Sequence, residues 1–314
     1  MDYGYGVPTR GDLATPEGIN KIAQHGEALG YNHVYVNDHI VVPGDISSRY
    51  PYSAAGDWPG APMGEAMEQL VLLSYLARAT EKARLLTSVM VVPHRNPVVT
   101  AKMLATIDVL SKGRVTVGCG VGWMREEFEA IGTAPYDKRG KVIDEYLEIF
   151  KELWTKDRPH YDGEFSSFSN IAFLPKPVQN PHPPLWIGGE SPLAMRRAAR
   201  LGDGWYPLGA NPQFPLDTME SYAAGVAQMK TELEKQGRDS AEFSFAYLVN
   251  WYAAPGDGKA HDGGRLLFTG SNDEIRGDVD AMRELGVKHL MLNFLSNDMS
   301  ETLDQMSRFA EDIM

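Results

Sequence analysis

Cysteine is almost absent from this sequence, in which Cys119 is the only one. A single cysteine excludes an internal disulfide framework and any metal cluster held by several thiolates. Cys119 stands among glycines with no histidine near it in the sequence, which favours a small packed side chain over a catalytic nucleophile. The chemistry of this protein is therefore expected to come from other residue types.

Long basic runs and long apolar runs are also lacking. The chain has 30 lysines and arginines against 42 aspartates and glutamates, so its formal net charge is −12. Without an extended basic run, binding to nucleic acid or to an anionic membrane is disfavoured. No apolar run approaches the roughly 20 residues that span a bilayer, and the first residues, MDYGYGVPTRG, do not resemble a signal peptide. We expect a cytoplasmic protein without a membrane or nucleic-acid partner.

Familiar catalytic motifs are missing as well. The sequence has no His-x-x-x-His pair, no histidine–carboxylate cluster with metal-ligand spacing, no G-x-S-x-G elbow and no Walker loop. A serine hydrolase and a nucleoside triphosphatase are therefore disfavoured, and no metal site is predicted.

What the sequence does contain is a regular alternation of apolar, strand-like runs and helical patterns. The runs cover residues 3–7, 33–37, 85–92, 115–117, 185–187, 204–208, 243–251 and 289–294. Eight strands that alternate with eight helices favour a TIM (β/α)8 barrel, an α/β fold, over a doubly wound sheet. With 314 residues, 43% of them hydrophobic, the chain can form a single domain over residues 1–314. Irregular insertions are expected after strands 2, 4 and 7, at residues 41–64, 156–183 and 254–264, the last being either a lid or an idle loop.

In such a barrel the active site lies where the strands end and the βα loops begin. Asp38 and His39 end the second predicted strand. A histidine at this place can serve as an acid or a base near neutral pH, and Asp38 is expected to orient it or to bind a polar ring. A purely structural histidine is the alternative.

The turn Gly188-Gly189-Glu190-Ser191-Pro192 follows the fifth predicted strand. Ser191 suits a helix N-cap, and proline suits the first helical turn. Bare backbone N–H groups at a helix start form an anion site, so a cofactor phosphate is the expected ligand. An ordinary capped turn is equally consistent with this pattern.

Residues 113–132, GRVTVGCGVGWMREEFEAIG, place Gly118, Gly120 and Gly122 after the fourth strand. Their spacing by two does not match the dinucleotide fingerprint G-x-G-x-x-G. Glycines let bare backbone approach a flat group closely, although a tight βα turn would use them too. Because these glycines stand at the carboxyl end of a predicted barrel strand, we interpret them as a wall beside a cofactor.

This stretch is preceded by TSVMVVPHRNPVVTAKMLATIDVLS and followed by PPLWIGGESPLAMRRAARLGDGWYPLG. Together the three segments resemble the bacterial-luciferase-like superfamily, and within it the branch of coenzyme F420-dependent oxidoreductases. The resemblance extends over essentially the whole chain. It implies a TIM barrel with insertions, a homodimer, and FMN or the deazaflavin F420 bound at the carboxyl ends of the strands.

The resemblance also implies roles for single residues. Asp38 would contact the deazaflavin ring, and His39 would be the active-site acid or base. A cis peptide bond between Ser88 and Val89 would press on one face of the ring. The other cofactor-binding residues would be Gly120, Glu126, Gly188, Gly189, Glu190, Ser191, Leu208 and Gly209, with the phosphate on Gly188, Gly189 and Ser191 and the tail along Leu208 and Gly209.

Trp123 departs from the family pattern. Sugar-phosphate dehydrogenases of this branch carry a catalytic glutamate at this position, so a sugar phosphate is not the expected substrate. Trp123 is predicted to belong to the catalytic site, and with Tyr50, Tyr52 and Trp58 it indicates a flatter or more apolar substrate. These three insertion aromatics would equally suit a small loop core or a dimer contact.

The leading hypothesis is an F420-dependent oxidoreductase that transfers hydride to or from a C=C or C=O group of a small organic substrate. The alternative is an FMNH2-dependent two-component monooxygenase that oxygenates such a substrate. A barrel that binds a ligand without catalysis is a third hypothesis, against which His39 and the turn at residues 188–191 argue.

Overall fold

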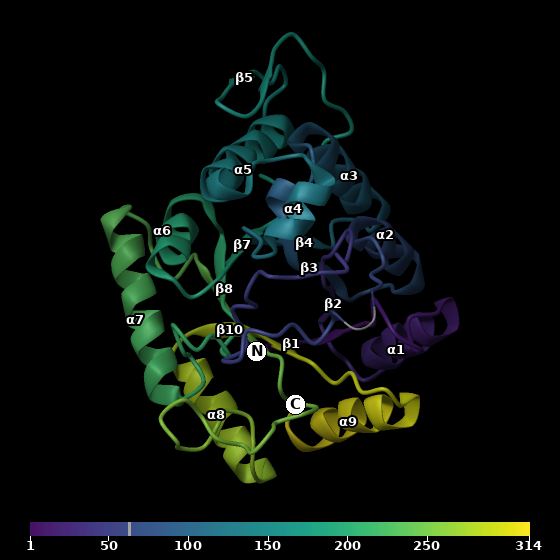
Figure 1. Cartoon of the computed structure of the whole chain (residues 1–314), viewed down its shortest axis with the longest axis vertical. Helices are drawn as coiled ribbons and strands as arrows, with labels where there is room; N and C mark the ends of the chain where they lie inside the picture. The colour runs from purple at the N-terminus through teal and green to yellow at the C-terminus, as the bar shows by residue number, and fades with distance from the viewer. Residues whose placement is uncertain (62–63) are drawn as a thin grey trace.

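The computed structural model describes residues 1–61 and 64–314. In these residues, eight parallel strands close into a barrel in the order β1, β10, β9, β8, β7, β4, β3, β2 (Figure 1). This topology confirms the predicted TIM barrel. The strands are β1 (Asp2–Gly6), β2 (His33–Val36), β3 (Arg84–Val91), β4 (Val115–Gly120), β7 (Leu185–Gly188), β8 (Gly204–Tyr206), β9 (Ser244–Val249) and β10 (Val287–Leu292).

Helices lie around the outside of the barrel (Figure 1). They are α1 (Pro16–Ala28), α2 (Gln69–Ala79), α3 (Pro97–Leu110), α4 (Arg125–Ile131), α5 (Arg139–Thr155), α6 (Pro192–Leu201), α7 (Met219–Lys235), α8 (Asn272–Glu284) and α9 (Met299–Asp312). Local chemistry sets their starts, as the sequence patterns Thr15-Pro16 and Ser271-x-x-Glu274 predict: Thr15 caps α1, and Ser271 forms a capping box with Glu274 at α8. None of the helices in the described ranges is long and apolar enough to cross a membrane.

Apolar side chains form two separate cores. The larger one lies between the sheet and the helices, and the smaller one fills the inside of the barrel. The smaller core, here called the inner plug, consists of Tyr35, Leu86, Trp186, Tyr206, Ala246 and Met291. Because a TIM barrel is packed along its axis, the inner plug separates the carboxyl ends of the strands from their amino ends.

Two element boundaries differ from the prediction. β4 does not end at residue 117 but continues through Gly118 and Gly120. A Cβ at Gly118 would collide with the backbone carbonyl of Thr87 on β3, so this glycine is a packing requirement of the sheet and not a turn. The helical pattern of residues 66–80 predicts a start at residue 66, but α2 begins at Gln69, because the side chain of Glu68 caps it.

The insertions lie at the predicted places, except that residues 62 and 63 of the first one lie outside the described residues. Residues 156–183 contain a short hairpin, β5 (Tyr161–Asp162) and β6 (Ser167–Phe168), which projects from one edge of the molecule (Figure 1). In the insertion after β9, His261 is tied to Asp217: its Nδ1 lies 2.5 Å from the carboxylate, and its backbone N–H donates to the same group at 2.8 Å.

Candidate active site

A cavity of about 460 Å³ opens at the carboxyl ends of the barrel strands, within the size range of cofactor pockets. The predicted site residues in its wall are Asp38, His39, Ser88, Val89, Gly120, Trp123, Gly188, Gly189 and Leu208. They follow or end different strands, so only the closed barrel brings them to one place. The structure thus gathers most of the predicted site residues around a single cavity.

His39 is held by Glu127, the second acid of α4. His39 Nδ1 lies 2.9 Å from Glu127 Oε2, and Glu127 Oε1 accepts a hydrogen bond from the backbone N–H of Ile40 at 2.7 Å. The Glu127 side chain is 1% exposed and that of His39 is 13% exposed, so the carboxylate is shielded from water while the ring keeps access to the cavity. Because a carboxylate can only accept, Nδ1 donates, and Nε2 is left as the proton-accepting atom of His39.

Asp38 has partners other than those predicted. Its Oδ1 and Oδ2 each accept a hydrogen bond from Arg95 at 2.7 Å, and Oδ2 also accepts one from the backbone N–H of Val91 at 2.8 Å. A bidentate arginine satisfies both carboxylate oxygens, so Asp38 joins the end of β2 to the end of β3. The prediction that Asp38 orients His39 is wrong, because Glu127 does so. Contact between Asp38 and a cofactor ring stays a prediction.

Val89 stands between two glycines in the cavity wall. The peptide bond between Ser88 and Val89 is cis, as the resemblance implied. A Cβ at Gly120 would lie 2.6 Å from Val89 Cγ2, and one at Gly188 would lie 3.1 Å from Val89 Cγ1. A side chain at either position would crowd Val89, so bare backbone flanks it on both sides. Contact between this wall and the planar ring of a flavin or deazaflavin stays a prediction.

The turn after β7 reaches the cavity through Gly188 and Gly189. Ser191 lies behind them, where its Oγ accepts a hydrogen bond from the backbone N–H of Ala194 at 3.2 Å and caps α6 as predicted. Since the hydroxyl of Ser191 can still donate its own proton, the turn keeps the donors that an anion needs. Phosphate binding by this turn stays a prediction.

Glu190 is buried behind the same turn and does not line the described cavity wall. Its carboxylate accepts hydrogen bonds from the backbone N–H of Leu208 at 2.8 Å and from Asn211 Nδ2 at 3.0 Å. Burial raises the pKa of Glu190 to about 7, although these hydrogen bonds oppose the rise. Glu190 therefore connects the turn after β7 to the loop after β8, and its contact with a cofactor stays a prediction.

Glu126 and Gly209 also stand outside the described wall. Glu126 Oε1 accepts hydrogen bonds from the backbone N–H groups of Ser47 at 2.8 Å and Ser48 at 3.0 Å, which anchors the first insertion. Gly209 lies against the ring of Tyr247. Both residues support the wall, and a direct role in cofactor binding stays a prediction for each.

Aromatic residues of the first insertion turn toward the cavity and form a cover over His39. The rings of Trp58 and His39 have centroids 4.3 Å apart, and those of Tyr50 and Trp123 are 5.2 Å apart. Tyr50, Tyr52, Trp58 and Trp123 all belong to the cavity wall. The cavity wall is therefore apolar on the side of these rings, whereas His39 and Glu127 provide polar atoms.

Several wall residues were not predicted. Asn250 and Asn293 follow β9 and β10, and His94 follows β3, so the strand-end rule contained the signal that finds them. Asn250 Oδ1 is buried without a hydrogen-bond partner among residues 1–61 and 64–314, which leaves an acceptor for a polar ligand. Burial lowers the pKa of His94 to about 4, so its ring is neutral near pH 7.

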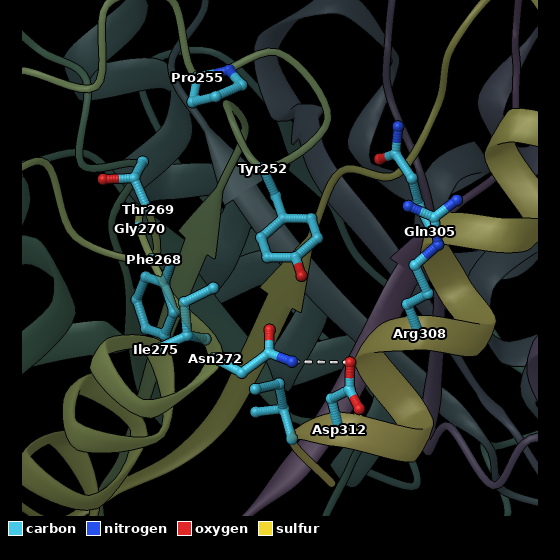
Figure 2. A pocket seen from close by; sticks show the side chains of 11 residues that line it. Tyr252, Pro255, Phe268, Thr269, Gly270, Asn272, Ile275, Gln305, Arg308 and Asp312 are labelled. Carbon is cyan, nitrogen blue, oxygen red and sulfur yellow. Dashed lines mark hydrogen bonds between the residues drawn. The ribbon is translucent and has the colours of Figure 1, made fainter.

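A second cavity of about 350 Å³ lies outside the barrel, between α8, α9 and the loop after β9 (Figure 2). Its wall includes Tyr252, Gln305 and Arg308, and Asn272 Nδ2 donates a hydrogen bond to Asp312 Oδ2 at 2.8 Å beside it. No predicted site residue belongs to the part of this wall that the structure describes. The cavity inside the barrel mouth is therefore the candidate active site.

Comparison with known sequences agrees with this geometry. A sequence profile of the luciferase-like monooxygenase family matches residues 1–269. The FMNH2-dependent dimethylsulfone monooxygenase of Pseudomonas putida is 36% identical over 146 residues, which are 46% of this chain and 40% of that enzyme.

Solved structures share the fold over the full length of the chain. The monooxygenase RslO1 from Streptomyces bottropensis has a TM-score of 0.77 and 22% identity, and the match covers 100% of this chain and 98% of that one. An F420-dependent secondary alcohol dehydrogenase, solved in complex with an F420-acetone adduct, has a TM-score of 0.74 and 18% identity with the same coverage. At these identities the likeness concerns the fold alone.

Proposed function

The chain belongs to the luciferase-like monooxygenase family, whose members are flavin- or F420-dependent oxidoreductases and monooxygenases. From that premise we propose that this protein is an F420-dependent oxidoreductase. It transfers hydride to or from an activated C=C or C=O group of a small organic molecule. The proposal rests mainly on the pair of His39 and the buried Glu127 beside the glycine-flanked wall at Val89.

The His39–Glu127 pair supplies the proton that such a reaction needs. When bound, the deazaflavin would supply or accept the hydride. Reduction of a C=O or C=C bond adds a hydride to a carbon at one end and a proton to the atom at the other end, and the reverse oxidation removes both. Glu127 fixes the ring of His39 through Nδ1, so Nε2 can hold that proton or release it. The carboxylate also stabilises the charged imidazolium that forms when Nε2 takes a proton.

The remaining wall residues fit the cofactor. Val89, flanked by Gly120 and Gly188, would support one face of the ring, and the free Oδ1 of Asn250 would accept a hydrogen bond from a ring N–H. The helix start at Ser191, reached through Gly189, would take a phosphate of the cofactor tail. Each of these groups binds or orients, and the proton transfer is left to His39.

The aromatic cover indicates the substrate class. Trp58, Trp123 and Tyr50 present ring faces and edges beside His39. A planar or apolar molecule packs on such rings, whereas a sugar phosphate would leave its hydroxyl groups without partners. We infer a flat, weakly polar substrate such as an unsaturated ketone.

A substrate-dependent redox assay tests the proposal. Under nitrogen, a panel of activated alkenes and ketones should oxidise reduced F420 only in the presence of the protein. His39→Gln should lower the rate by about 10²- to 10⁴-fold, the range of general acid–base catalysis. His160→Gln, which replaces an exposed histidine, is the matched control and should leave the rate unchanged. A rate for His39→Gln within a few-fold of the parent would contradict the assigned role.

An FMNH2-dependent monooxygenase is the second candidate. It is favoured by the aromatic cover beside His39, which would help to keep water from a bound cofactor, and by the 36% identity with the dimethylsulfone enzyme. The same panel should then be oxygenated in air with FMNH2, and reduced F420 should remain unused. The homodimer and the cytoplasmic location expected from the sequence stay predictions.

A further inference from the structure

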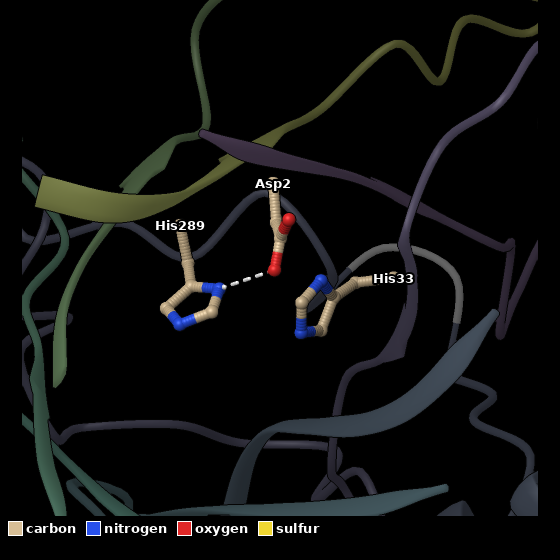
Figure 3. A group of neighbouring side chains, drawn as sticks. All are labelled: Asp2, His33 and His289. Atoms are coloured by element: carbon tan, nitrogen blue, oxygen red, sulfur yellow. Dashed lines mark ion pairs between the residues drawn. The ribbon is translucent and has the colours of Figure 1, made fainter. Parts of the chain in front are cut away.

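Three potential metal ligands meet at the amino ends of the barrel strands, at the mouth opposite the candidate active site. Asp2 lies on β1, His33 on β2 and His289 on β10. One ligand atom of each lies within 4.8 Å of those of the other two. In Figure 3 the carboxylate of Asp2 lies between the two imidazole rings. The three strands are neighbours, since β1 pairs with both β2 and β10.

The polar atoms of this group lack ordinary partners. His33 is fully buried, and neither of its ring nitrogens has a hydrogen-bond partner in the described chain. His289 Nδ1 lies 3.2 Å from Asp2 Oδ2, an ion pair when the ring is protonated, but no hydrogen bond to Nδ1 forms within the described chain. The indole Nε1 of Trp186, whose ring lies 4.6 Å from that of His289, is a further buried atom without a partner among these residues. Buried polar atoms are rarely left unpaired, so a cluster of them requires an explanation such as an ion.

We propose that Asp2, His33 and His289 bind a divalent transition-metal ion such as Zn²⁺. Two imidazoles and one carboxylate form a common ligand set for such ions, with a position left for water. The indole N–H of Trp186 lies beside this group and can serve a metal-bound water as a hydrogen-bond donor.

The surroundings favour an ion. The side chain of Asp2 is 47% exposed, which leaves a path from solvent. Arg84, the neighbour of His33 on β3, directs its guanidinium to Thr116 at 2.9 Å and to the carbonyl of Val115 at 2.8 Å. The positive charge of Arg84 is therefore directed to hydrogen-bond acceptors on β4.

The position predicts what the ion does. It would connect β1 to both of its neighbours at the seam where the first and last strands close the barrel. The inner plug, including Trp186, separates this group from the cavity that contains His39. The ion would therefore stabilise the closed barrel and take no part in the proposed redox reaction.

Zinc binding to the untagged, chelator-treated protein tests this proposal. Competition with a chromophoric chelator should give one Zn²⁺ per chain, and the midpoint of thermal unfolding should rise by about 5 °C when free Zn²⁺ is 100 times its Kd. Asp2→Asn, which changes a half-exposed side chain, and His33→Gln should each weaken Zn²⁺ binding by at least about 10-fold. His261→Gln, which removes a histidine paired with one carboxylate, is the matched control and should leave the affinity unchanged.

The visible spectrum of bound Co²⁺ gives a second readout. Bound Co²⁺ should show the intense bands of a low-coordinate site in the parent and lose them in Asp2→Asn. Absence of Zn²⁺ binding, or binding that both variants retain, would overturn the proposal. Should His33→Gln fail to fold, Asp2→Asn decides the outcome alone. Neither outcome affects the proposed function, because cofactor binding is measured at the other mouth of the barrel.

Discussion

Replacing Glu127 with glutamine tests how His39 is controlled. The parent carboxylate accepts the proton of His39 Nδ1 at 2.9 Å and a backbone N–H at 2.7 Å. In Glu127→Gln the amide oxygen can keep the backbone bond, but the amide N–H₂ then faces Nδ1–H. The ring must move its proton to Nε2 or turn away from residue 127, and either change removes the acceptor from the cavity side.

The size of the effect follows from the hydrogen bond that is lost. A hydrogen bond to a charged group contributes about 1.5–3 kcal/mol, and each 1.36 kcal/mol in the barrier changes a rate tenfold. Since the carboxylate is buried, with Glu127 1% exposed, solvent screening weakens this hydrogen bond little. Turnover with the best substrate of the panel should therefore fall by about 10- to 150-fold.

Two measurements check this prediction. The ¹⁵N shifts of the imidazole of His39 report which nitrogen carries the proton, and they should change from Nδ1–H in the parent to Nε2–H in Glu127→Gln. Steady-state oxidation of reduced F420 gives the rate. Glu129→Gln, an exposed change on the same helix, is the control and should alter neither readout. An unchanged tautomer together with a rate within about threefold of the parent would refute the reasoning.

Three further predictions concern stability and the wall. Because burial raises the pKa of Glu190 to about 7 from 4.5, the folded protein keeps this proton longer than the unfolded chain does. The free energy of unfolding should thus fall by up to about 3 kcal/mol as the pH rises from 4.5 to 7. In urea unfolding, Glu190→Gln should remove this pH dependence, and the same pH dependence in the parent and the variant would contradict the prediction. Gly120→Ala should weaken cofactor binding at least about tenfold, because its Cβ would lie 2.6 Å from Val89 Cγ2, whereas Gly44→Ala, with open space around it, should not. Gly277→Ala, exposed in α8 with nothing near its Cβ, should raise the free energy of unfolding by about 0.4–1 kcal/mol, and a decrease would show that the helix is strained there.

Local patterns made the barrel and its helix starts predictable. The capping residues Thr15, Ser191 and Ser271 act within three residues of themselves, so sequence alone contains the signal. The end of β4 was missed because the reason for Gly118 lies on another strand, in the carbonyl of Thr87. A glycine that makes room for a neighbouring strand looks the same in a sequence as a glycine in a turn.

The pairing of charges at the site could not be predicted for the same reason. His39 and Glu127 are 88 residues apart, and Asp38 and Arg95 are 57 apart. Glu126 and Glu127 are adjacent and chemically alike, and only the orientation of α4 directs Glu127 to His39 and Glu126 to the first insertion. The group of Asp2, His33 and His289 has no motif spacing at all and arises from barrel closure.

Binding of the two cofactors to the ligand-free protein tests the central claim most directly. Titration with F420 and separately with FMN, followed by absorbance and by quenching of cofactor fluorescence, gives both affinities. We predict saturable binding of F420, one per chain, tighter than that of FMN and weakened in Gly120→Ala. Tight binding of FMN without binding of F420 would contradict the claim and favour the monooxygenase, and binding of neither would contradict both proposed functions.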